Sequence, residues 1–187
     1  RGATTIICND AAQRAEAHPE LAFIVHPNPL VVVQSWAKNK RNELRGPLLA
    51  ITGSTGKTVV KEWLFQLLGT PLEVHRTPGS FNSTLGIALA MSSLKESHAK
   101  AIIEVGIDRP GTMEAHAQWL RPALGIFTNL GNAHSEHFSN EDSYFTERWL
   151  LFSPCERFAT HLQWCGKVQC LGLRPPTELL WGPDKDL

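Results

Sequence analysis

The segment from Leu48 to Leu68, LLAITGSTGKTVVKEWLFQLL, constrains the fold of this chain more than any other. It begins with an apolar run, residues 48–51, of the kind found in strands that are covered on both faces of a sheet. From Val60 onward, apolar residues recur at helical spacing and predict an amphipathic helix over residues 60–68. A glycine-containing turn joins the two. The segment therefore predicts a strand, a tight loop and a helix in immediate succession.

The loop between this strand and helix has the composition of a phosphate-binding site. Gly53 and Gly56 allow the backbone to turn so that its N–H groups face an anion at the helix N-terminus. Lys57 adds a positive charge for the β- and γ-phosphates, and the hydroxyl of Thr58 can bind Mg²⁺. We predict a nucleotide site here and call residues 53–58 the phosphate loop.

The phosphate loop is shorter than the general pattern, which places four residues between its first glycine and its Gly-Lys pair. Here only Ser54 and Thr55 separate Gly53 from Gly56, and Ile51 stands where the general pattern has glycine. The alternative is an ordinary strand-to-helix turn with a solvated lysine. We favour the phosphate site because the strand, glycines, lysine, threonine and helix all agree.

Composition narrows the class of protein. The 187 residues suit one ordinary domain. With 18 basic and 18 acidic residues the formal charge is zero, so nucleic acid is not an expected partner. No apolar run reaches membrane-spanning length, and a nucleotide site favours the cytoplasm. Free thiols are therefore expected at the four cysteines, which are Cys8, Cys155, Cys165 and Cys170.

Strands and helices are expected to alternate along the chain, which predicts an α/β fold with a doubly wound, mostly parallel sheet. Asn28 and Pro29 form a helix start, with Asn28 as the cap. Beyond Ser153 the pattern weakens, and no element is assigned to the tail, residues 153–187. Strands are expected at 4–8, 21–25, 48–51, 101–103 and 123–127, and helices at 28–44, 60–68, 82–94, 110–120 and 141–152.

Polar residues follow two of the later strands. Glu104 comes directly after the apolar residues 101–103, where an unpaired buried carboxylate would be costly. A metal ion that joins it to nucleotide phosphates would remove that cost. Without the phosphate loop, Glu104 would more simply be an ion-pair partner or a helix cap. Since ligands bind at the carboxyl ends of such strands, we favour a metal ligand.

The strand at 123–127 leads into a loop that carries His134, Glu136 and His137. A histidine in such a loop can simply be solvated. Neutral imidazole can also bind a cation near a transferred phosphate. Its position nearer the strand end favours His134 over His137 as a second metal ligand.

Four segments of the chain form a distinctive series: TGSTGKT at 52–58, SFNSTLGIAL at 80–89, EVGIDRPGTME at 104–114 and GIFTNLGNAHSEHF at 125–138. In this order they resemble the Mur ligase family, the ATP-dependent amide-forming enzymes of peptidoglycan synthesis. Within it, the chain is most similar to the branch that adds D-alanyl-D-alanine to a UDP-N-acetylmuramoyl tripeptide, in the form fused to an alanine racemase. The resemblance covers residues 20–152.

The resemblance implies a chemistry that uses ATP and Mg²⁺. ATP phosphorylates the carboxylate of the UDP-linked peptide, the amine of the dipeptide attacks the acyl phosphate, and phosphate leaves. By this resemblance Lys57, Glu104 and His134 are the catalytic residues, and Thr58, Glu104 and His134 hold the metal. Asn82 and Ser83 would contact substrate. The nucleotide would be held by Gly53, Ser54, Thr55, Gly56, Lys57 and Thr58.

Two positions depart from the family pattern. The family has asparagine where Thr55 stands. It also has a lysine, carbamoylated to bind a second metal, at the position that aligns with Arg148. Arginine is a permanent cation and is a poor substitute for that ligand. We expect Arg148 to contact the phosphate or the carboxylate directly, as a substrate-binding residue.

The resemblance also implies a division of the chain. Residues 1–26 would be a remnant of an N-terminal domain that binds the UDP substrate, and residues 27–187 an incomplete central ATP-binding domain. The C-terminal ligase domain of the family would be absent, so this chain alone is expected not to complete ligation. Two alternatives stay open, a non-catalytic nucleotide-binding module and a ligase similar to folylpolyglutamate synthase.

Overall fold

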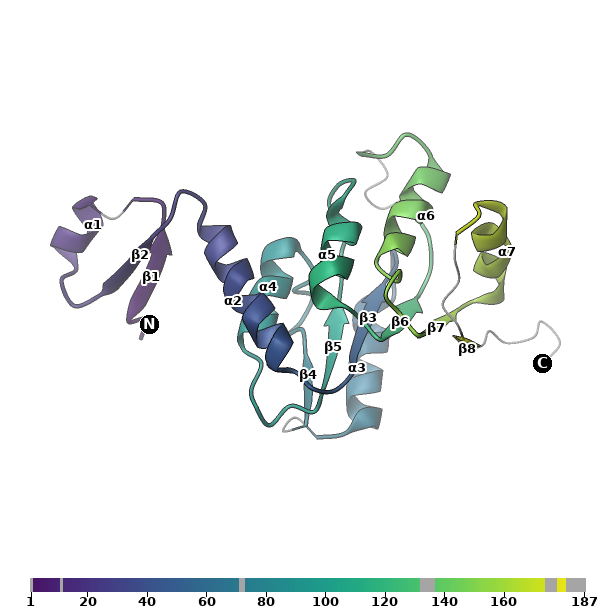
Figure 1. The fold of residues 1–187 in the computed structure, drawn as a ribbon, viewed down its shortest axis with the longest axis horizontal. Coiled ribbons are helices and arrows are strands. Elements are labelled where there is room, and N and C mark those ends of the chain that lie inside the picture. Colours follow the sequence, from purple (N-terminus) through teal and green to yellow (C-terminus); the bar gives the residue numbers. More distant parts are fainter. Residues whose placement is uncertain (1, 11, 71–72, 132–136, 174–177, 181–187) are drawn as a thin grey trace.

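The computed structural model describes the chain except for residues 1, 11, 71–72, 132–136, 174–177 and 181–187. Its main body is a six-stranded sheet in the order β4-β5-β3-β6-β7-β8, and every neighbouring pair is parallel. The predicted doubly wound α/β fold is therefore confirmed (Figure 1). The strands are β3 (Leu48–Thr52), β4 (Val74–Arg76), β5 (Lys100–Glu104), β6 (Leu124–Phe127), β7 (Arg157–Thr160) and β8 (Glu178–Leu180).

Helices cover both faces of this sheet. One face carries most of them, and the opposite face carries α3, the helix that follows the phosphate loop (Figure 1). The helices of the main body are α2 (Pro29–Glu43), α3 (Lys57–Leu68), α4 (Thr84–Ser92), α5 (Thr112–Leu120), α6 (Glu141–Leu150) and α7 (Leu162–Cys170).

Strand β3 is the centre of the fold. All five of its residues are buried, as its continuous apolar sequence predicts. Leu48 and Ala50 pack into the core beneath α2 and α4, whereas Leu49 and Ile51 point to the opposite face of the sheet and pack against α3. The chain leaves β3 toward β4 and later crosses to β6 on the other side. The carboxyl end of β3 therefore lies at a topological switch point, where α/β sheets bind ligands.

A small N-terminal unit stands apart from the six-stranded sheet, at the far end of α2 (Figure 1). It consists of β1 (Thr5–Cys8), α1 (Ala12–Ala17) and β2 (Ala22–Val25), and its two strands pair in parallel. Both strands were expected from the sequence, whereas α1 was not. Helix α2 begins as predicted, since Asn28 accepts a hydrogen bond from the N–H of Leu30 and Pro29 opens the helix.

Several elements differ from the sequence-based expectation. Helix α4 starts at Thr84, later than expected, because Ser83 caps it. Strand β4 was not predicted, and neither were β7, α7 and β8, which fold the supposedly featureless tail onto the sheet. The side chain of Trp164 packs edge-on against Phe127, so α7 is joined to the core.

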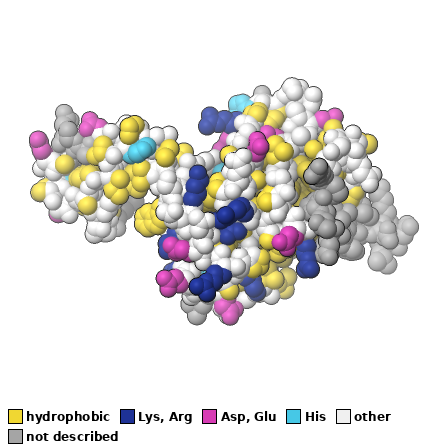
Figure 2. All heavy atoms as spheres, viewed as in Figure 1, with side chains coloured by type: hydrophobic (Ala, Val, Ile, Leu, Met, Phe, Trp, Pro, Cys, Tyr) yellow, Lys and Arg dark blue, Asp and Glu magenta, His cyan; other side chains and the backbone are white. Residues whose placement is uncertain are grey.

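The surface agrees with the balanced composition. On the face seen in Figure 2, acidic and basic side chains are interspersed. The four cysteines are free thiols, as expected. Within the described residues, no helix combines the length and the apolar character needed to cross a membrane.

Candidate functional site

The phosphate loop takes the backbone shape that its glycines predict. Gly53 has φ +142° and Gly56 has φ +79°, and α3 begins at the next residue, Lys57. A Cβ at Gly53 would lie 2.0 Å from Oγ1 of Thr128, so only glycine fits there. The first N–H groups of α3 have no acceptor within their helix. They form a site for an anion at the helix N-terminus.

The loop is held by residues that follow β6. The side chain of Asn129 bonds to Thr55 twice, accepting from its backbone N–H at 2.9 Å and donating to its Oγ1 at 2.6 Å. Thr128 donates to the carbonyl of Thr55 at 2.7 Å, and Gly131 donates to the hydroxyl of Ser54 at 2.8 Å. Thr55, which departs from the family pattern, therefore has a structural role in fixing the loop.

The side chain of Lys57 folds back onto the phosphate loop. Its ammonium donates to the carbonyl of Gly53 at 2.8 Å and to that of Ser54 at 3.3 Å. Burial lowers the pKa of Lys57, the positive charge of Arg148 lowers it further, and the carboxylate of Glu104 opposes both. The ammonium is thus placed among the loop atoms that would surround a phosphate.

Glu104 gathers two other predicted site residues around its carboxylate. Thr58 donates its hydroxyl to Oε2 at 2.8 Å, and Asn82 donates its amide to Oε1 at 2.7 Å. Glu104 itself is buried, and its backbone N–H donates to the hydroxyl of Thr77 at 3.1 Å. The structure therefore brings together Thr58, Asn82 and Glu104 from α3, the loop before α4 and the end of β5.

Lys61 is a site residue that the sequence analysis missed. Its side chain is fully buried, and Nζ lies 3.6 Å from Oε2 of Glu104 and 3.3 Å from Oε1 of Glu62. It also donates to the carbonyl of Gly79. The alternative interpretation of Glu104 as an ion-pair partner is thus confirmed, and its role as a metal ligand stays a prediction. The sequence did contain a sign of Lys61's position. Lys61 follows Lys57 by one helical turn, so both lie on the same face of the helix.

Arg148 is bonded to the end of β3 and to the phosphate loop. Its guanidinium is buried and donates from Nη1 to Oγ1 of Thr52 and to the carbonyl of Gly53, both at 3.0 Å. Nη2 bonds to the hydroxyl of Tyr144, four residues earlier on α6. Burial lowers the pKa of Arg148. Arg148 therefore supports the phosphate loop, and its direct contact with a phosphate or a carboxylate stays a prediction.

The remaining predicted site residues make no described contact with Glu104 or the phosphate loop. His134 lies outside the described residues, and His137 is exposed. The hydroxyl of Ser83 accepts from the N–H of Gly86 and so caps α4. Within the described part of the chain, no three His, Cys, Asp or Glu side chains gather into a metal site.

This donor set fits a magnesium–nucleotide complex. Mg²⁺ in such sites is held by one or two carboxylates and hydroxyls together with phosphate oxygens, and it keeps several waters. Glu104 and Thr58 supply one carboxylate and one hydroxyl within 2.8 Å of each other. Lys57 and the start of α3 supply the positive charge and the N–H groups for phosphates. The fold and the site together define a phosphate-loop nucleotide-binding domain.

The family follows from comparison with known proteins. The Mur ligase middle domain matches residues 51–162, and the chain belongs to this family. The match includes the phosphate loop, Glu104 and Arg148. The resemblance inferred from the four sequence segments is thereby confirmed.

Curated relatives are UDP-N-acetylmuramoyl-tripeptide–D-alanyl-D-alanine ligases. That of Bacillus subtilis is 30% identical over 121 residues, which cover 65% of this chain and 26% of the relative. That of Rickettsia prowazekii is 32% identical over 152 residues, which cover 81% of this chain and 33% of the relative. The chain therefore spans a third or less of the length of these two proteins.

Solved structures share the fold at low sequence identity. MurF from Acinetobacter baumannii aligns with a TM-score of 0.75 at 19% identity, over 92% of this chain and 38% of that one. MurF from Thermotoga maritima, solved in complex with ADP, aligns with a TM-score of 0.78 at 19% identity, over 92% of this chain and 46% of that one. These likenesses confirm the architecture.

Proposed function

We propose that this chain is the ATP-binding part of a ligase that adds D-alanyl-D-alanine to a UDP-N-acetylmuramoyl tripeptide in peptidoglycan synthesis. In this proposal residues 27–187 are the central domain, and residues 1–26 belong to a domain for the UDP-linked substrate. The relatives named above carry out this reaction according to their names. We propose the cytoplasm as the location of this reaction, because the reaction uses a nucleotide.

The observation that carries the proposal is the contact of Glu104 with Thr58 and Asn82, at 2.8 and 2.7 Å, beside the phosphate loop. Glu104 and Thr58 would hold Mg²⁺, and Lys57 would contact the β- and γ-phosphates. His134 is proposed as a further ligand on the strength of the family resemblance alone. The bound cation would neutralise charge on the transferred phosphoryl group.

The chain's own residues then have defined tasks. The loop N–H groups and Lys57 would hold the γ-phosphate for transfer to the carboxylate of the UDP-linked peptide. Asn82 bonds to Glu104 and lies just before α4, and we propose that it also contacts bound substrate. Transfer gives an acyl phosphate, which the amine of D-alanyl-D-alanine attacks with loss of phosphate. A fused or adjacent alanine racemase is proposed on the sequence resemblance only.

Calorimetric titration with a non-hydrolysable ATP analogue tests the site. We expect binding that depends on Mg²⁺ and that Lys57→Met and Glu104→Gln each weaken by about 10- to 100-fold, since hydrogen bonds to charged groups contribute about 1.5–3 kcal/mol. Glu114→Gln on the exposed side of α5 is the matched control and should bind normally. Failure of the unchanged chain to bind the analogue would refute the proposal.

A second candidate, a non-catalytic nucleotide-binding module, is favoured by Arg148. Its guanidinium is bonded to the loop, at the position that aligns with the metal-binding lysine of the family. The same titration separates the two candidates. Equal affinity with and without Mg²⁺, and no effect of Glu104→Gln, would select the module.

A further inference from the structure

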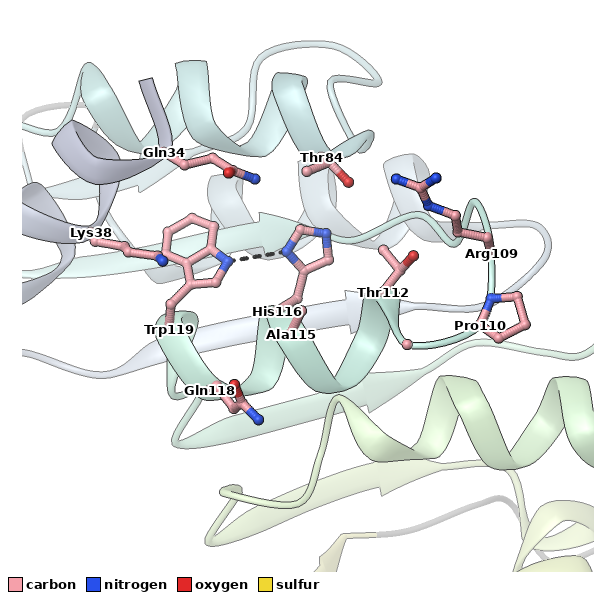
Figure 3. A pocket seen from close by; sticks show the side chains of 11 residues that line it. Gln34, Lys38, Thr84, Arg109, Pro110, Thr112, Ala115, His116, Gln118 and Trp119 are labelled. Atoms are coloured by element: carbon pink, nitrogen blue, oxygen red, sulfur yellow. Dashed lines mark hydrogen bonds between the residues drawn. The ribbon is translucent and has the colours of Figure 1, made fainter. Parts of the chain in front are cut away.

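A polar cavity of about 610 Å³ lies between α2, the start of α4 and α5. Figure 3 shows His116 and Trp119 pointing from α5 toward Gln34 of α2 and Thr84 of α4, with Arg109 at the end of the cavity next to Thr112. The residues that line this cavity take no part in the interactions described above for the phosphate loop. The cavity is therefore separate from the contacts that hold Glu104.

One lining side chain is buried with an unused hydrogen-bonding atom. His116 has only 2% of its surface exposed, and no described residue bonds to its Nε2. Its other ring nitrogen, Nδ1, lies 3.2 Å from Nε1 of Trp119. Since the indole N–H can only donate, Nδ1 of His116 must accept.

This assignment fixes the proton on the imidazole. Burial lowers the pKa of His116 to about 4, so the ring is neutral near pH 7. A neutral ring that accepts at Nδ1 carries its proton at Nε2. In Figure 3 the ring nitrogen that has no dashed line faces toward Thr84, into the cavity. The cavity therefore contains a buried N–H donor that lacks an acceptor, which costs free energy unless a ligand or water supplies one.

The charges around the cavity favour an anionic acceptor. Of the described residues that line it, Lys38 and Arg109 are cationic and none is acidic. Asp108 is exposed and does not line the cavity, and its negative charge opposes the lowering of the His116 pKa. Helix α5 begins at Thr112, and the partial positive charge of its N-terminus adds to the charges of Lys38 and Arg109.

We propose that this cavity binds an oxyanion, a carboxylate or a phosphate, of the substrate that the ligase activates, at a group other than the reacting carboxylate. His116 Nε2–H and Arg109 are the donors, and Lys38 adds positive charge at the Trp119 end of the cavity (Figure 3). This inference rests on the proposed function. Thr84 follows Asn82 closely in the chain, and Arg109 lies on the connection that leaves Glu104, so the cavity shares two segments with the phosphate site. Holding a substrate at a second charged group would orient its reacting carboxylate.

Nitrogen-15 NMR of histidine-labelled protein tests the proposal directly. The Nε2 signal of His116, assigned from its loss in His116→Gln, is followed during titration with inorganic phosphate, UDP, and an acetylated tripeptide whose terminal carboxylate is amidated and whose second carboxylate is free. The same tripeptide with both carboxylates amidated is the neutral control. We expect a saturable shift with the oxyanions and none with the amide. A response to UDP alone identifies a phosphate group, and a response to the tripeptide alone identifies a carboxylate.

Variants of the lining residues assign the binding to this cavity, with affinity read from the backbone amide signals of residues 109–119. Arg109→Met should weaken binding by about tenfold, in the range of one charge-assisted hydrogen bond. Lys38→Met should weaken it by a smaller factor, because Lys38 contributes charge at the other end of the cavity. Lys40→Met is the matched control, because Lys40 lies on the same helix but pairs with Glu43 and does not line the cavity. His116→Gln retains a donor and should bind more tightly than His116→Leu.

The outcomes separate this inference from the proposed function. If Mg²⁺–nucleotide binds and no oxyanion shifts the His116 signal, the cavity holds only water and the inference is wrong. If oxyanions bind and the nucleotide does not, the proposed function fails whereas the cavity stays an anion site. Equal weakening by Lys40→Met and Lys38→Met would also overturn the inference, since binding would then follow overall charge.

Discussion

Arg148 and Lys61 place two buried cations close to one phosphate loop. Arg148 bonds to the carbonyl of Gly53, and Lys61 lies 3.6 Å from Glu104. Their tasks differ. Arg148 ties α6 to the end of β3, whereas Lys61 provides a countercharge for the carboxylate that we propose as a metal ligand. Buried charges of this kind are costly unless they are paired and hydrogen-bonded.

Removing Lys61 should therefore destabilise the fold. Lys61→Met leaves Glu104 without its buried countercharge, and we expect a loss of about 3 kcal/mol in the free energy of unfolding. Urea denaturation measures it. Lys100→Met is the control, because among the described residues Lys100 makes only a long, exposed bond to the carbonyl of Leu68. The double variant Lys61→Met/Glu104→Gln should recover part of the loss. Equal midpoints for Lys61→Met and Lys100→Met would contradict this account of the pair.

The sequence indicated the phosphate loop and Glu104 because their signals are local. A strand, glycines and a lysine stand within one short segment, and the carboxylate follows an apolar run. The bonds of Arg148 could not be predicted, since they join residues that are far apart in the chain. The cavity at His116 was missed for the same reason, because its lining comes from three separate helices.

Among the elements, those with a strong local signal were predicted and the short ones were not. Helix α2 has its Asn28 cap and its proline, and β3 has a continuous apolar run. Strand β4 is only three residues long and contains His75 and Arg76, so its pairing with β5 determines its conformation. Helix α7 carries Gly166 in its interior, which lowers its intrinsic helix propensity. Its packing on the core outweighs that cost.

Helix α6 depends on its first turn. Asn140 accepts from the N–H of Ser143 at 2.8 Å, and the Ser143 hydroxyl accepts from the backbone N–H of Asn140 in return. We expect Asn140→Ala to lower the free energy of unfolding by about 1 kcal/mol. Because α6 carries Arg148, hydrogen exchange at Gly53 should also accelerate.

Thermal and chemical denaturation of Asn140→Ala measures the first effect. Ser139→Ala is the control, since the one bond of the Ser139 hydroxyl within the described residues is to another exposed hydroxyl, at 3.3 Å. If Asn140→Ala were as stable as Ser139→Ala, the cap would have no energetic role.

For the whole molecule, two buried histidines link stability to pH. Burial lowers the pKa values of His75 and His116 to about 4. Between about pH 6.5 and pH 4 the unfolded chain binds a proton at each position and the folded chain does not. Their contribution is therefore complete above pH 6.5 and is lost as the pH falls toward 4. Between pH 7 and pH 5 we expect a loss of about 2 kcal/mol per histidine.

Urea denaturation at a series of pH values measures this slope. The double variant His75→Gln/His116→Gln should show a flatter profile over the same range, because glutamine does not titrate. His18→Gln serves as the control, since His18 is exposed on the N-terminal unit. A profile that is unchanged in the double variant would assign the pH dependence to other groups.

The central claim is that the phosphate loop and Glu104 hold one divalent cation with a nucleotide. Paramagnetic broadening of backbone amide signals by Mn²⁺ with ADP tests it most directly, because broadening falls steeply with distance from the cation. We predict that the signals of Thr58 and Glu104 broaden first and that of Asn82 next, while the signal of Val168 on α7 stays sharp. Broadening that centres instead on Glu141 and Asp142, the exposed carboxylates beside Lys167, would contradict it.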